Sequence, residues 1–111
     1  MTPEQTVLPK IHFAPMQGYT DVAFRLAYKN TLGGIFYYYS PYLPVGKHKE
    51  IDDCHDISKN LELDQVKNLI PQILPANLKE FIQLANRVES LGYKRINLNM
   101  GCPYSMVLLI R

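Results

Sequence analysis

Two amide side chains and one thiol stand close together near the end of the chain. The segment Asn97-Leu98-Asn99-Met100-Gly101-Cys102-Pro103 alternates amide and apolar residues before a glycine and a cysteine. Successive side chains of a strand point to opposite faces, so Asn97 and Asn99 are expected to share one face. Amides are costly on a dry face without partners, which predicts that they bind a ligand or each other.

Cys102 follows this predicted strand and brings acid–base chemistry to its end. An unperturbed thiol has a pKa of about 8.5, so near neutrality it is mostly protonated and can donate a proton. A nucleophilic cysteine would want a neighbouring cationic group, and no histidine follows in the motif. The alternative to a catalytic role is that Cys102 is a small buried side chain of the core, the usual role of a lone cysteine.

Short apolar runs alternate with helical stretches, which predicts an α/β fold with a parallel sheet. The expected strands are Ile11–Ala14, Ile35–Tyr39, Leu69–Leu74 and Arg95–Met100. Ligands bind at the carboxyl ends of the strands in βα barrels. The amides of the last strand would therefore lie at a binding edge.

Two helices are expected between these strands. Thr20 or Asp21 can cap the first, and Leu32-Gly33-Gly34 ends it. Asn77 opens the second, with Glu80 completing a capping-box pattern and Gly92 at the left-handed stop position. The predicted apolar stripe of this helix consists of Leu78, Phe81, Ile82, Ala85, Val88 and Leu91.

Residues 41–60 are expected to form a long polar loop, and Leu61–Lys67 fits either a short helix or a strand. His48 and His55 lie in the loop near several aspartates, but their spacing matches no standard metal site, so no metal is assigned. Cys54 receives no role.

The composition argues for an ordinary soluble domain. The net charge of +2 is too small to indicate nucleic acid by itself. The N-terminus lacks the apolar core of a signal peptide, and Met106–Ile110 is too short to cross a bilayer. Two cysteines make no disulfide framework, so a reduced, cytoplasmic protein is expected.

Three segments together resemble the tRNA-dihydrouridine synthase family. The first is Ala14-Pro15-Met16-Gln17-Gly18-Tyr19-Thr20-Asp21, followed by Phe24-Arg25; the second is Pro71-Gln72-Ile73; the third runs from Asn97 to Pro103. Their order and spacing are similar to those of the family from about Ile11 to Val107. The resemblance implies a (β/α)8 barrel that binds FMN and reduces uridine in tRNA to 5,6-dihydrouridine, with NADPH as reductant.

The resemblance also implies roles for single residues. Pro15, Met16 and Gln17 match the segment whose backbone lies along the flavin ring, and Gln72 matches a glutamine on the polar edge of that ring. Asn99 and, more weakly, Asn97 match substrate-side positions. Cys102 matches the cysteine that protonates C5 of the uridine after hydride reaches C6.

The chain is shorter than such a barrel, which needs about 250 residues. Residues 1–111 supply about four βα units, so we expect the first half of the barrel, truncated and inactive alone, with open sheet edges prone to self-association. Two alternatives remain. One is another FMN-dependent barrel oxidoreductase of the dihydroorotate or dihydropyrimidine dehydrogenase type. The other is a non-catalytic half-barrel that binds a partner.

Overall fold

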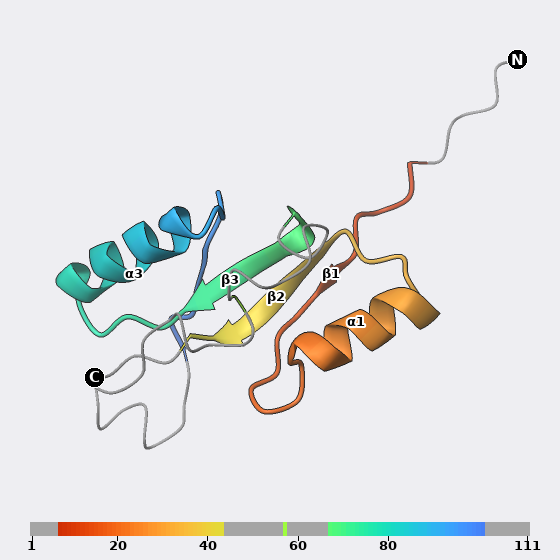
Figure 1. Cartoon of the computed structure of the whole chain (residues 1–111). Helices are drawn as coiled ribbons and strands as arrows, with labels where there is room; N and C mark the ends of the chain where they lie inside the picture. The colour runs from red at the N-terminus through yellow and green to blue at the C-terminus, as the bar shows by residue number, and fades with distance from the viewer. Residues whose placement is uncertain (1–6, 44–56, 58–66, 102–111) are drawn as a thin grey trace, which may run out of the picture.

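The part of the chain that the structure describes contains four strands and two helices, in the order β1-α1-β2-β3-α3-β4 (Figure 1). The structure is a computed structural model that describes residues 7–43, 57 and 67–101. The elements are β1 (His12–Phe13), α1 (Val22–Thr31), β2 (Tyr37–Tyr42), β3 (Leu69–Ile73), α3 (Leu78–Ser90) and β4 (Asn97–Leu98). The order predicted from the sequence is confirmed.

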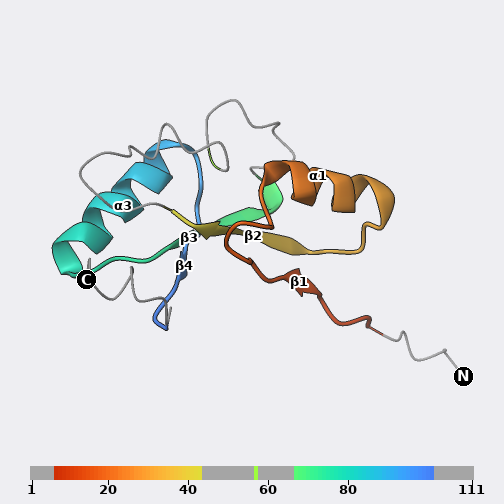
Figure 2. The same cartoon turned by 90° about the horizontal axis from the view of Figure 1, so that it is seen from below.

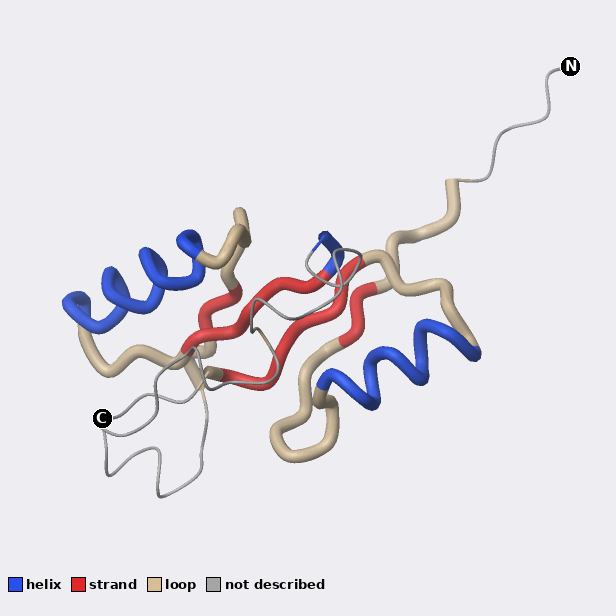
Figure 3. The backbone as a smooth tube through the Cα atoms, in the orientation of Figure 1, coloured by secondary structure: helices blue, strands red, loops and turns tan. Residues whose placement is uncertain are grey.

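The strands form one parallel sheet in the order β1-β2-β3-β4, so neighbours in sequence are neighbours in space (Figure 3). His12 pairs with Tyr37, Tyr38 with Leu69, and Gln72 with Asn97. The sheet curls, and both helices lie on the same side of it (Figure 2). This is the architecture of part of a (β/α)8 barrel, which confirms the expected fold class.

The hydrophobic core lies between the sheet and the helices. Ile73 of β3 and Val88 of α3 are fully buried, and Tyr38, Leu69 and Leu84 complete the centre. Residues one position away along the strands, such as Gln72, point to the opposite face. That face is the inner one in a closed barrel.

Side-chain caps begin both helices, as the sequence predicted. Asp21 caps α1, because its Oδ1 accepts the Phe24 N–H at 2.8 Å. Asn77 caps α3 through the Glu80 N–H at 2.9 Å. Glu80 departs from the capping-box pattern, since its Oε2 accepts from the N–H of Ala76. Gly92 has a φ of 100°, the left-handed conformation expected of it.

The predicted stripe of α3 is partly wrong. Leu84, absent from the prediction, is buried, whereas Leu78 and Ile82 are 73% and 48% exposed. Phe81, Val88 and Leu91 of the predicted stripe do pack against the core. Apolar residues cover more than one face of this helix, so the spacing alone did not decide which face meets the sheet.

The strand limits also differ from the prediction. β2 continues through Pro41 to Tyr42, so the predicted loop at residues 41–60 begins too early. The β2–β3 pairing shifts between Tyr39 and Tyr42, and such an irregularity tolerates a proline that has no N–H to donate. Strands β1 and β4 are each two residues long, and β3 ends at Ile73.

The interior of the predicted loop lies outside the described residues, apart from Ile57, which is fully buried in the core. His48, Cys54 and His55 are among the residues not described, as is most of Leu61–Lys67. Within the described ranges, neither helix is long and apolar enough to cross a membrane.

Candidate functional site

Three amide side chains meet where β3 and β4 end. Gln72 Nε2 donates to Asn97 Oδ1 at 2.7 Å, and Asn99 Nδ2 donates to Gln72 Oε1 at 3.3 Å. The Gly101 N–H then donates to Asn99 Oδ1 at 3.1 Å. The sequence predicted that the two asparagines bind a ligand or each other. The structure brings both to Gln72, which joins them.

The backbone of Gln72 is fixed as firmly as its side chain. Its N–H donates to the hydroxyl of Ser40 at 3.0 Å, and its carbonyl accepts the Leu43 N–H at 2.8 Å. Ser40 Oγ in turn donates to the Pro41 carbonyl at 2.9 Å. Gln72 is only 9% exposed, so this amide is held in place before any ligand arrives. Ser40 has no motif in the sequence that could have revealed its role.

The loop after β1 lies at the same edge of the sheet, since all four strands are parallel (Figure 1). Thr20 closes the loop: its Oγ1 accepts the Met16 N–H at 2.9 Å and donates to the Met16 carbonyl at 3.2 Å. Gly18 makes the turn with a φ of 83°. Arg25 is 4% exposed and donates to the Thr20 carbonyl at 2.7 Å, which ties the loop to α1.

The backbone of Met16 is therefore already occupied within the loop. Its side chain is 60% exposed, Gln17 is exposed and Pro15 is half-buried. The Met16 N–H and carbonyl are thus engaged within the loop, and the flavin contact expected along the backbone of Pro15, Met16 and Gln17 stays a prediction. Arg25 belongs to the first of the three segments quoted above, and its hydrogen bond to the Thr20 carbonyl gives it a structural role there.

The end of β4 differs in part from the prediction. Ile96 packs against the core on the helix side, but Leu98 and Met100 are 41% and 75% exposed. None of the described helices covers them. Gly101 is the last described residue of this segment, so Cys102 lies just outside the described residues.

Aromatic and basic side chains lie on the amide face, nearer the start of the strands. The ring of His12 lies 5.6 Å from that of Tyr37 and 5.8 Å from that of Tyr39, whose hydroxyl is 2.7 Å from His12 Nδ1. Arg95 donates to the Tyr37 hydroxyl and lies over its ring. The run of three tyrosines thus belongs to the sheet, in β2.

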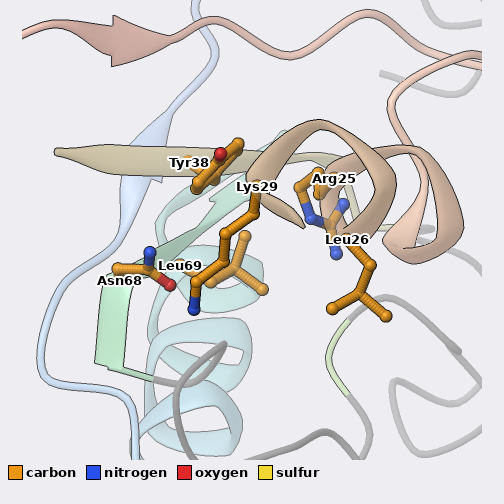
Figure 4. A pocket seen from close by; sticks show the side chains of 6 residues that line it. All are labelled: Arg25, Leu26, Lys29, Tyr38, Asn68 and Leu69. Atoms are coloured by element: carbon orange, nitrogen blue, oxygen red, sulfur yellow. The ribbon is translucent and has the colours of Figure 1, made fainter. Parts of the chain in front are cut away.

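A small pocket lies on the helix side, lined by Arg25, Leu26, Lys29, Tyr38, Asn68 and Leu69 (Figure 4). Its volume of about 10 Å³ is close to the least that holds one water. Burial raises the pKa of Tyr38 above its ordinary value, and nearby Tyr28 adds to the rise. None of the three amides lines this pocket, which is too small for a cofactor.

The fold defines a class: part of a βα barrel, an architecture in which ligands bind at the carboxyl ends of the strands. The sequence model of the dihydrouridine synthase (Dus) family matches residues 12–108, which include every described strand. The chain belongs to this family, whose members are flavin-dependent oxidoreductases that form dihydrouridine in tRNA. No curated protein and no solved structure matches it significantly.

The amide cluster fits the polar edge of a flavin. An amide both donates and accepts hydrogen bonds, as the carbonyl and imide groups of that ring edge require. After the bonds described above, Gln72 Nε2 keeps one N–H, and Asn97 Nδ2 makes no hydrogen bond within the part of the chain that is described. Half-buried N–H groups without a partner in the described part of the chain are suited to donate to a polar ligand.

Proposed function

We propose that this chain forms the flavin- and base-contacting part of an enzyme that reduces uridine in tRNA to 5,6-dihydrouridine. FMN would be the cofactor, NADPH its reductant and the cytoplasm its location. The amide cluster of Gln72, Asn97 and Asn99 is the single observation that carries the proposal. It stands at the strand ends, where barrels of this class bind ligands.

Each proposed contact uses chemistry that the residue possesses. Gln72 holds the polar edge of the flavin through its remaining N–H group, and Asn97 supports Gln72 by accepting from its Nε2. The exposed side chains of Met16 and Gln17 border the ring from the loop after β1. Asn99 donates to Gln72 and accepts from the Gly101 N–H, and we assign it to the uridine side of the site.

Bound and reduced, FMN would supply the hydride for C6 of the uridine. The Cys102 thiol would supply the proton for C5, so that one hydride and one proton add across the C5–C6 double bond. The protonated thiol is the form that can act as a general acid, and it predominates near neutrality when the thiol pKa is about 8.5.

A fluorescence titration of FMN with the purified chain tests the flavin site. We expect saturable quenching that weakens at least about tenfold in Gln72→Leu, a loss of roughly 1.4 kcal/mol. Asn86→Leu is the matched control, because Asn86 is an exposed amide on α3. Absence of saturable quenching with the wild-type chain, or equal affinity for Gln72→Leu, would contradict the proposal.

Turnover is a separate measurement. We expect no dihydrouridine in tRNA incubated with this chain, FMN and NADPH, because the described strands are four of the eight that close such a barrel. Formation of dihydrouridine would refute the expected inactivity and leave the flavin site standing.

The role of Cys102 is tested by alkylation in a Cys54→Ser background. If Cys102 is a proton donor, its rate of alkylation by iodoacetamide should rise with pH and reach half of its maximum at about pH 8.5, as for an ordinary thiol. A rate that is already maximal below pH 7 would indicate a thiolate nucleophile instead. Cys102→Ala in the same background gives the blank.

A further inference from the structure

The three amides and Gly101 form a hydrogen-bond chain with a defined direction. The Gly101 N–H donates to Asn99, Asn99 donates to Gln72, and Gln72 donates to Asn97. Each side-chain amide has one end that donates and one that accepts, and a half-turn exchanges them. Something must therefore select one of the two directions.

The backbone supplies that selection. A main-chain N–H can only donate, so Gly101 requires the oxygen of Asn99. The nitrogen of Asn99 then faces Gln72, which must present its oxygen there. The nitrogen of Gln72 is left to donate to the oxygen of Asn97. One turn at the end of β4 thus sets the orientation of three side chains.

We propose that Asn99 and Asn97 are positioning residues that fix the orientation of the Gln72 amide, so that Gln72 presents its remaining N–H donor to the ligand. The site consequently selects acceptor atoms, which are carbonyl oxygens or unprotonated ring nitrogens. The consequence for flavin binding rests on the proposed function. The direction of the amide chain does not, and it can be measured without a cofactor.

Two substitutions of identical chemistry separate the two asparagines. Asn97→Asp keeps an oxygen that accepts from Gln72 Nε2, so the direction survives. Asn99→Asp still accepts from Gly101 but cannot donate to Gln72 Oε1, so the Gln72 amide must turn over to donate to the introduced carboxylate, and the direction is reversed. Both variants introduce the same negative charge, two residues apart, in β4 and directly after it. A difference between them therefore reports hydrogen-bond direction, not charge.

The first readout is the side-chain amide of Gln72 in ¹⁵N–¹H NMR spectra, without FMN. We expect two separate, slowly exchanging proton signals in the wild type and in Asn97→Asp. In Asn99→Asp we expect both signals to move away from their wild-type positions, because the amide turns over and Nε2 then donates to the introduced carboxylate instead of Asn97. Equal behaviour of the two variants would overturn the proposal.

The second readout is FMN affinity by fluorescence titration. We expect Asn99→Asp to bind FMN about tenfold more weakly than Asn97→Asp, equivalent to about 1.4 kcal/mol. If the wild type binds no FMN, the proposed function fails while the NMR result still decides the amide direction. If Asn99→Asp does not fold by circular dichroism, Asn99→Ala takes its place, and unchanged exchange at Gln72 in that variant refutes the positioning role.

Discussion

Ser40→Ala removes the one hydroxyl that accepts the backbone N–H of Gln72. Ser40 is fully buried and the hydrogen bond is 3.0 Å long. The pairing of β2 with β3 shifts at this point, so the hydroxyl takes the place that a main-chain carbonyl has in a regular ladder. Alanine leaves the Gln72 N–H without an acceptor in a place that water does not reach easily.

The expected loss follows from that orphaned donor. A buried donor without a partner costs about 1–3 kcal/mol, whereas a well-solvated one costs little. The Pro41 carbonyl also loses its donor, but a carbonyl tolerates this better than an N–H does. We therefore expect a decrease in unfolding free energy of about 1–3 kcal/mol, and roughly 4–8 °C in Tm for each kcal/mol in a domain of this size.

Urea denaturation followed by circular dichroism measures the change, with Ser90→Ala as the matched control. The Ser90 hydroxyl also donates to a carbonyl, that of Arg87 at 2.7 Å, but Ser90 is exposed. Water replaces the lost bond there, so we expect a change within about 0.5 kcal/mol. Indistinguishable midpoints for the two alanine variants would refute the reasoning, because burial is the principal difference between them.

The remaining predictions concern the core, a buried hydroxyl and the sheet edges. Leu84→Ala should lower the unfolding free energy by about 2–5 kcal/mol and Leu78→Ala by less than about 0.5 kcal/mol in urea titrations, since only Leu84 is buried; the reverse order would restore the stripe that the sequence suggested. Tyr38→Phe should not destabilise the chain at pH 7, because the buried Tyr38 hydroxyl has no hydrogen-bond partner among the described residues. Since the folded state raises the pKa of Tyr38, the wild type should lose stability as the pH rises above about 10, where the unfolded tyrosine ionises. Tyr38→Phe should lose less over that range, and parallel pH–stability curves would speak against this assignment. The outer edges of β1 and β4 should promote self-association, seen as a concentration-dependent mass in analytical ultracentrifugation, whereas a monomer at all concentrations would exclude it.

Local signals in the sequence were sufficient for the elements and their caps. Asp21 and Asn77 cap helices through contacts to residues three positions away, which is information contained in a short segment. The shared face of Asn97 and Asn99 followed from strand periodicity alone. The resemblance to the family added Gln72, and the structure then placed it between the two asparagines.

Features that depend on contacts between distant segments could not be predicted from local sequence signals. Pro41 argued for a loop because proline cannot donate to a ladder, and only the shifted pairing with β3 explains its place in β2. Leu84 and Leu78 have the same side chain on the same helix, so only the sheet determines which of them is buried. Ser40 acts on a residue 32 positions away, and no short pattern predicts such a contact.

The three consecutive tyrosines of β2 have a consequence for how the strand finds its alignment. Tyr38 faces the helices, while Tyr37 and Tyr39 meet the ring of His12 on the other face. A slip by one residue would exchange the faces yet still offer tyrosine to both sides for much of the strand. The tyrosines thus discriminate poorly between the correct register and one displaced by a residue. The hydrogen bond of Ser40 to Gln72 forms only in the correct register and therefore specifies it.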